Sequence, residues 1–245
     1  MKLSEGLRKG LAIRQKLGRP YCAAVIVAAG SSSRMNGTNK ILTVVERLPV
    51  ICRTVDAFDR CAAIDEIVVV AQPELMEKVS RYLAAYKKMR IVVPGGATRT
   101  ASVMAGLAAV SEKTQLVAVH DGARPLVTDA VITRTVAKAK KFAAAAPAVR
   151  VKDTIKVSSD GTVDETPDRA KLFAVQTPQV FDRDLLEAAL QNAQEQGLAL
   201  TDDCSAVEAL GMPVQLTDGD EENIKLTTPL DLELAALIIR RRQEA

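Results

Sequence analysis

The sequence predicts an α/β fold with a mainly parallel sheet and helices on both faces. Short runs rich in β-branched residues alternate with longer stretches that have helical spacing. Because parallel strands need long crossover connections, this alternation favours a parallel sheet over an antiparallel one. The chain of 245 residues, 48% of them hydrophobic, is also long enough to bury the core of one such domain.

The alternation is regular from residue 24 to residue 141. Strands are expected at 24–28, 67–71, 91–93 and 116–120, and helices at 49–63, 74–86, 98–110 and 128–141. Ligands of such sheets bind beyond the carboxyl ends of the strands. The loops that follow these strands are therefore the candidate site.

The stretch VKDTIKVSSDGTVDETPDR, residues 151–169, breaks this pattern. Ile155 and Val157 alternate with polar residues before a turn at Asp160-Gly161, which predicts a β-hairpin. Two strands with so few apolar residues are not stable alone. We therefore expect a projecting arm that lies on another body, and a second subunit is the simplest one.

After the arm, helices are expected at 182–196 and 203–210, a short strand at 214–216, and a last helix from about Pro229. No repeat or linker divides residues 21–245, so they are expected to form a single domain. Residues 1–20 form a basic N-terminal extension with six basic residues and one acidic residue. A frayed or locally helical extension is the first reading, and a nucleic-acid arm or a targeting segment is the alternative.

Composition excludes several classes of function. The whole chain has a net charge of +3, and the extension alone has +5, so the remaining residues have −2. This charge does not indicate a nucleic-acid binder. The four cysteines form no CxxC pair and there is one histidine, so a zinc site is not expected and the thiols should be reduced. The sequence contains no run of 18 apolar residues, so no membrane span is predicted and a cytoplasmic protein is expected.

The loop AAGSSSRM, residues 28–35, follows the first expected strand and has the composition of a phosphate cradle. Small side chains let backbone N–H groups approach an anion, and Arg34 and Lys40 add positive charge. The loop matches neither the dinucleotide-binding fingerprint nor a Walker A motif. A plain turn between strand and helix is the alternative reading of this stretch alone.

Three further motifs lie at expected strand ends or beside them. In VHDGARP, the carboxylate of Asp121 can hold Mg²⁺ beside phosphates, or it can close the strand in an Asx turn. In PGGATRTASV, two glycines open a helix and bring Ser102 near the sheet edge. In ENIKLTTPLDL, Lys225 stands in a short apolar stretch that is expected to be a strand, where a cation is costly unless it serves an anion.

Seven motifs in order give the chain a resemblance to the 2-C-methyl-D-erythritol 4-phosphate cytidylyltransferase family, from about Tyr21 onward. They are AAGSSSRM, GGATRTASV, HDGARP, VKDTIK, TPQVF, LTDDCSAVE and ENIKLTTPLDL. The resemblance implies a Rossmann-like, twisted sheet and a transfer of cytidylyl from CTP to the polyol phosphate, with release of pyrophosphate. Ribitol 5-phosphate cytidylyltransferases share nearly every motif and are the nearest alternative. A non-catalytic nucleotide- or RNA-binding protein is the alternative of another class.

The resemblance also implies roles for individual residues. Arg34 and Lys40 match the cations on the triphosphate, Lys225 matches a cation near both substrates, and Asp121 matches the Mg²⁺ ligand. The cytidine half of the site falls, largely through backbone, on Ala28, Ala29, Gly30, Gly96, Ser102 and Gly122. The acceptor half falls on Arg124, Thr154, Arg169 and Thr201.

The arm connects the site to the oligomeric state. Thr154 and Arg169 lie at its base and match acceptor-binding positions, so we expect a two-fold homodimer in which each site borrows both residues from the neighbouring subunit.

The chain departs from many relatives at Ser32, where they have glycine, and at Ile41, where they have glutamine. His120 is expected in the core or behind the site, because an attacking phosphate needs no general base.

Overall fold

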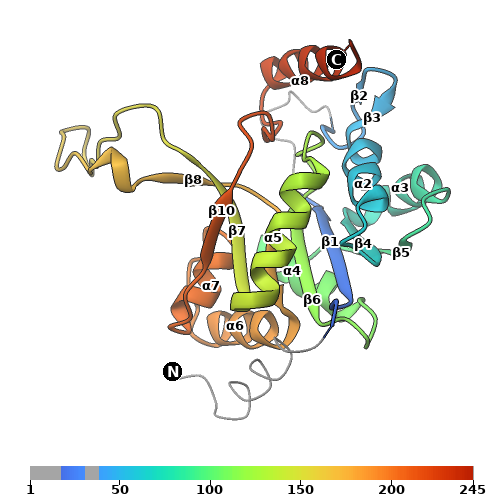
Figure 1. Ribbon diagram of the computed structural model, residues 1–245, viewed down its shortest axis with the longest axis horizontal. Coiled ribbons are helices and arrows are strands. Elements are labelled where there is room, and N and C mark those ends of the chain that lie inside the picture. Colours follow the sequence, from blue (N-terminus) through green and yellow to red (C-terminus); the bar gives the residue numbers. More distant parts are fainter. Residues whose placement is uncertain (1–17, 31–38, 245) are drawn as a thin grey trace.

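The computed structural model describes residues 18–30 and 39–244, which form a central sheet with helices on both sides (Figure 1). The strand order is β10-β7-β9-β6-β1-β4-β5, and β8 pairs with β7. In chain order the strands are β1 (Cys22–Ala28), β4 (Glu66–Ala71), β5 (Met89–Pro94), β6 (Leu116–Asp121), β7 (Ala144–Arg150), β8 (Phe173–Val175), β9 (Gln179–Asp182) and β10 (Gln215–Asp218). A separate small ladder joins β2 (Val44–Val45) to β3 (Leu48–Pro49).

The predicted fold class is confirmed. β5, β4, β1 and β6 are parallel neighbours, as are β10 and β7, whereas β9 runs antiparallel between β6 and β7, and β8 is antiparallel to β7. The register pairs Val27 with Asp121 and Ala28 with Ala71. The carboxyl ends of three parallel strands therefore lie at one edge of the sheet.

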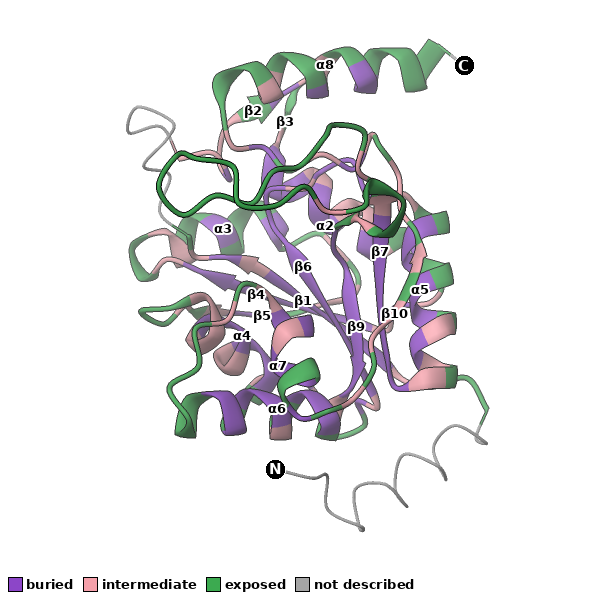
Figure 2. Ribbon diagram, turned by 90° about the vertical axis from the view of Figure 1, so that its left-hand side faces the viewer, coloured by how far each residue is buried: buried purple, intermediate pink, exposed green. Residues whose placement is uncertain are grey.

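Two hydrophobic clusters cover the faces of the sheet, and alternate residues of β1 contribute to each (Figure 2). One cluster includes α2 (Val50–Arg60), α3 (Met76–Leu83), α5 (Asp129–Phe142) and α8 (Pro229–Glu244). The other includes α4 (Arg99–Ala108), α6 (Arg183–Glu195) and α7 (Asp203–Ala209). Among the described helices, none has the length and hydropathy needed to span a membrane.

Helix α4 packs unusually close to the sheet. A Cβ added at Gly106 would collide with Val25 Cγ1 and would lie 2.9 Å from Val70 Cγ2. Glycine at this position thus fixes the distance between α4 and strands β1 and β4. That distance sets where the first turn of α4 lies relative to the sheet edge.

The arm differs from the predicted hairpin. Residues 151–168 project from the body between β7 and the short 3₁₀ turn Arg169–Lys171 that precedes β8 (Figure 1), with one isolated bridge between Val157 and Glu165 in place of two strands. The turn itself is as expected, with Gly161 at φ +95° and Thr162 N–H donating to Asp160 Oδ1 at 2.8 Å. Within this chain the arm's side chains are exposed, so the ladder has no core to stabilise it.

One other expectation on secondary structure was wrong, and two strands were missed. Lys225 lies in irregular chain before α8, held by Leu226 N–H donating to Ala123 O at 2.8 Å, and not in a strand. Strand β7 was not expected, because its sequence AAAPAVR is rich in alanine and contains Pro147. Strand β9 has only four residues and was also missed.

Candidate active site

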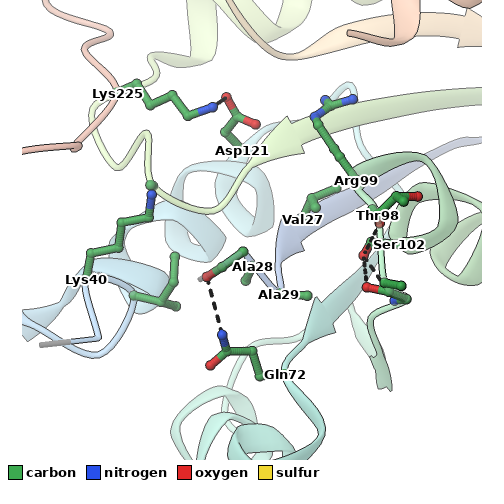
Figure 3. Close-up of a pocket in the computed structure, with 15 residues that line it drawn as sticks. Val27, Ala28, Ala29, Lys40, Gln72, Thr98, Arg99, Ser102, Asp121 and Lys225 are labelled. Carbon is green, nitrogen blue, oxygen red and sulfur yellow. Dashed lines mark hydrogen bonds and ion pairs between the residues drawn. The ribbon is translucent and has the colours of Figure 1, made fainter. Parts of the chain in front are cut away.

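A cavity of about 440 Å³ opens at the carboxyl edge of β1, β4, β5 and β6 (Figure 3). Its walls come from the loops after these strands and from the irregular segment before α8. The lining residues are Val27, Ala28, Ala29, Gly30, Lys40, Ile41, Gln72, Gly96, Ala97, Thr98, Arg99, Ser102, Asp121, Ala123 and Lys225. Most of the positions predicted for the nucleotide half therefore meet in one place.

Ala29 and Gly30, the described start of the loop after β1, line the cavity beside Ala28 at the end of the strand. Gln72, which follows β4, donates from Nε2 to the carbonyl of Gly30 at 3.4 Å, and Asn39 donates to Gln72 Oε1 at 3.2 Å. These contacts hold the two ends of the loop near the sheet edge. Arg34 and Ser32 lie outside the described residues.

The loop after β5 is shaped by two glycines and by Ser102. A Cβ on Gly95 would collide with Ala29 Cβ, so glycine allows the two loops to touch. The Ser102 hydroxyl accepts from Gly96 N–H at 3.1 Å and donates to Thr98 O at 3.0 Å. Ser102 lines the cavity as predicted, but its hydroxyl is used to hold the loop.

Asp121 ends β6 and is the carboxylate of the cavity wall. It is 8% exposed, and its Oδ2 lies 3.0 Å from Lys225 Nζ and 3.4 Å from Arg124 Nε. Burial alone would raise its pKa, but Lys225 first, and then Arg124 and Arg99, hold the pKa of Asp121 at about 2. The carboxylate is therefore ionised at neutral pH.

Arg124 and His120 support this edge from behind. Arg124 donates to Asn223 O at 2.7 Å and does not line this cavity, so its role toward the acceptor stays a prediction. His120 is fully buried, as expected, between Thr177 Oγ1 at 2.9 Å and Arg124 O at 3.2 Å. Desolvation lowers the pKa of His120 to about 4, so the ring is neutral.

The remaining predicted residues lie apart from the cavity. Gly122 packs its backbone on β1, donating to Val27 O at 2.9 Å, and does not line the cavity. Thr201 faces a second hollow beside Phe173 and bonds Ser205 Oγ at 2.9 Å. Thr154 and Arg169 belong to the arm, where Arg169 donates to Lys152 O at 2.8 Å. Thr154, Arg169 and Thr201 are thus outside the lining of the cavity that holds Asp121.

Arg99 and Gln72 are among the cavity residues that sequence reasoning missed. Arg99 opens α4 and pairs with the buried Asp203 at 2.8 Å, and Gln72 holds the loop after β1. Arg99 stands within the GGATRTASV motif, where a cation on the first turn of a helix was a usable signal. Gln72 carries no signal of its own.

Comparisons with known proteins agree with this geometry. The family model described as 2-C-methyl-D-erythritol 4-phosphate cytidylyltransferase matches residues 22–241. A curated protein of that name from Desulforamulus reducens is 46% identical over 225 residues, which is 89% of this chain and 96% of the relative. One from Caldanaerobacter subterraneus is 44% identical over 224 residues, which is 89% of this chain and 99% of that protein.

Solved structures show the same fold. The 4-diphosphocytidyl-2C-methyl-D-erythritol synthase of Anaerococcus prevotii superimposes with a TM-score of 0.82 at 31% identity, covering 90% of this chain and 96% of that one. The 2-C-methyl-D-erythritol 4-phosphate cytidylyltransferase of Thermus thermophilus gives 0.73 at 32% identity, covering 90% and 99%. With this sheet, this cavity and these relatives, the chain belongs to the 2-C-methyl-D-erythritol 4-phosphate cytidylyltransferase family of nucleotidyltransferases.

Proposed function

We propose that this chain converts CTP and 2-C-methyl-D-erythritol 4-phosphate into 4-diphosphocytidyl-2-C-methyl-D-erythritol and pyrophosphate, a step of non-mevalonate isoprenoid biosynthesis. The observation that carries the proposal is the cavity itself. Ala28, Ala29 and Gly30 form one part of its wall. The same wall carries three cations and one ionised carboxylate, which are Lys40, Arg99, Lys225 and Asp121. That combination suits a triphosphate, and the family assigns the base and the acceptor.

To catalyse this reaction, the protein must position the two substrates and provide positive charge around the phosphates. A phosphate oxygen of the acceptor attacks the α-phosphorus of CTP in line, and negative charge grows on the equatorial oxygens and on the departing pyrophosphate. We assign Lys40 and Arg34 to the triphosphate and Lys225 to the space between the two substrates. The neutral, buried His120 takes no part as a base, because the attacking oxygen is already an anion.

Mg²⁺ fits the residues present. Among the described residues no three acidic, histidine or cysteine side chains gather as a metal centre, and Asp121 is the carboxylate of the cavity wall. Magnesium is commonly held by one or two carboxylates together with substrate phosphates. Asp121 would hold the ion, which would neutralise phosphate charge, while Lys225 lies 3.0 Å from the same carboxylate and is placed to neutralise the phosphates as well.

The acceptor half needs a second subunit. The exposed arm carries Thr154 and Arg169, and its apolar residues Ile155, Val157 and Val163 are 40%, 46% and 55% exposed in this chain. We assign the arm to the active site of a partner in a cytoplasmic homodimer. There Thr154 and Arg169 would join Thr201 and Arg124 around the acceptor phosphate.

The test is pyrophosphate release from CTP and Mg²⁺ with each of two acceptors in parallel, 2-C-methyl-D-erythritol 4-phosphate and ribitol 5-phosphate. Turnover with the first and at least about a hundredfold lower kcat/KM with the second is the expected result, because a misfit that leaves buried polar groups unpaired is costly. Preference for ribitol 5-phosphate would overturn the assignment of the acceptor. Without turnover on either acceptor the proposed reaction is wrong.

A further inference from the structure

Arg99 is a cation of the cavity wall to which the family resemblance gave no role. It lines the cavity, and its side chain extends from the start of α4 toward the part that holds Asp121 (Figure 3). Asp121 and Arg99 each shift the pKa of the other in the direction expected of opposite charges. The guanidinium therefore lies where an anion beside Asp121 would feel its charge.

Local folding does not favour a cation at this position. The N-terminus of a helix carries partial positive charge, so arginine on the first turn is disfavoured there. Helix α4 has no acidic residue in its first turn, and its cap is the hydroxyl of Thr98, which accepts from Ala101 N–H at 3.0 Å. The charge of Arg99 must be balanced from outside the helix.

Asp203 supplies that balance. It is the first residue of α7, 1% exposed, and its Oδ2 lies 2.8 Å from Arg99 Nη2. Among the described residues Oδ2 accepts no hydrogen bond of acceptable geometry. Its contact with Arg99 is therefore described as an ion pair. Gln179 fixes the backbone of α7 by accepting from Asp203 N–H at 3.1 Å. The backbone of Asp203 is thus held in place, and the residue does not line the cavity.

The burial of Asp203 makes the two residues depend on each other. Desolvation raises the pKa of Asp203, and Arg99 is the largest opposing influence on it. Desolvation by itself would lower the pKa of Arg99, but Asp203 raises it above its ordinary value. Arg99 is one third exposed, at 32% of its side chain, and it lines both this cavity and a neighbouring hollow along α4. A guanidinium has five N–H donors, more than the contact with Asp203 uses.

We propose that Arg99 is a nucleotide-binding residue, which donates to the CTP phosphates, and that Asp203 is the positioning residue that fixes its guanidinium. The inference rests on the proposed function, since CTP is the anion concerned. It differs from a purely structural role, in which the pair would only tie α4 to α7. A structural tie changes stability, whereas a positioned cation changes CTP affinity.

The experiment measures CTP binding by calorimetry with Mg²⁺ and no acceptor. Arg99→Ala should raise the Kd for CTP by about 10-fold to 100-fold, as expected for a lost hydrogen bond to a charged group. Asp203→Asn removes charge from a residue outside the cavity and should still raise this Kd several-fold. The double variant should bind CTP as Arg99→Ala does, within about twofold, because Asp203 acts through Arg99.

Arg90→Ala is the matched control. Arg90 also lies near a buried carboxylate, Glu66, with Nη1 3.7 Å from Oε2, but it is remote from the cavity lining. Its loss should leave the Kd for CTP unchanged. Arg99→Lys keeps a charge beside Asp203 without the fork of donors, so it should unfold at the wild-type temperature and bind CTP several-fold more weakly.

Wild-type CTP affinity in either Asp203→Asn or Arg99→Lys would overturn the inference. It would also be overturned if the Kd for CTP of the double variant rose by the product of the two single-variant factors. A change seen only in the KM for the acceptor would overturn it as well. The wild-type chain is assayed for pyrophosphate release alongside. If it bound CTP without turnover, the proposed function would fail while the affinities would still decide the role of Arg99.

Discussion

Asp121 shows how one side chain sets the charge of the cavity. It is buried, yet two cations within 3.4 Å keep it ionised and ready for a divalent ion. From the sequence its position at a strand end was predictable. Its ion pair with Lys225 was not, because Lys225 approaches from a segment about a hundred residues later in the chain.

Asp121→Asn is expected to lower pyrophosphate release by about a hundredfold or more, because the amide cannot supply the negative ligand that Mg²⁺ prefers. The fold should survive, since Lys225 is 42% exposed and water can solvate it. Turnover at saturating substrates and the thermal unfolding midpoint are measured together. Near-normal turnover would remove Asp121 from metal binding.

Lys40→Ala and Arg34→Ala are expected to lower kcat more than they raise the KM for CTP. Charge that meets the pyrophosphate as it departs stabilises the transition state more than the bound substrate. Initial rates over a range of CTP concentrations separate the two effects. A change in KM alone would make either residue a binding group only.

His120 is the single histidine of the chain, and its burial predicts a pH effect on stability. Its pKa is about 4 in the folded state and near 6.5 when unfolded, so between these values the unfolded state binds more protons. Stability should be full above pH 6.5 and fall as the pH drops toward 4, by about 3 kcal/mol in total. Urea unfolding at several pH values measures this.

His120→Gln is the matching variant for that experiment. It cannot take up the proton, so its free energy of unfolding should change much less between pH 6.5 and 4 than that of the wild type. Equal pH dependence in the two proteins would assign the effect to other groups. Asp121 does not confuse the comparison, because it is present in both proteins and its contribution to the pH dependence cancels between them.

At the scale of elements, sequence patterns located what is locally encoded. Strands β4 and β6 are runs of β-branched residues buried on both faces, which is why they were predictable. The alanine-rich β7 forms because β10, β9 and β8 pair with it, which no local pattern reveals. The arm has the local pattern of a hairpin but does not form two strands, because in the described part of this chain it packs on no other part of the sheet that would stabilise them. Thr154, Thr201 and Arg169 were named by resemblance, and the structure of one chain leaves them outside the lining of the cavity that holds Asp121.

Helix α4 offers a test of packing at this scale. In Gly106→Ala, helix propensity favours alanine by about 1 kcal/mol, but overpacking against Val25 and Val70 costs about 1 to 3 kcal/mol. We expect a net loss of stability and a weaker kcat/KM, because α4 carries Arg99 and Ser102. Gly18→Ala, where a Cβ meets nothing within 4 Å, is the control and should change neither quantity.

At the scale of the whole molecule, the predicted homodimer can be tested by mixing subunits. Arg34→Ala and Arg169→Ala chains should each be nearly inactive alone. After exchange, half of the dimers are mixed, and one of their two sites contains neither lesion, so about a quarter of wild-type activity should return. A monomer in light scattering, or no recovery after verified exchange, would mean that the arm serves its own chain.

The four cysteines give the molecule a practical property. Cys22, Cys52, Cys61 and Cys204 are all buried free thiols, and burial raises the pKa of each. Because the thiolate is the reactive form, alkylating reagents and mild oxidants should leave the native protein almost untouched. A cysteine placed on the exposed arm, such as Ser159→Cys, would then be the one thiol that a spectroscopic probe labels. The distance between two such probes would report directly on how the arms of a pair are arranged.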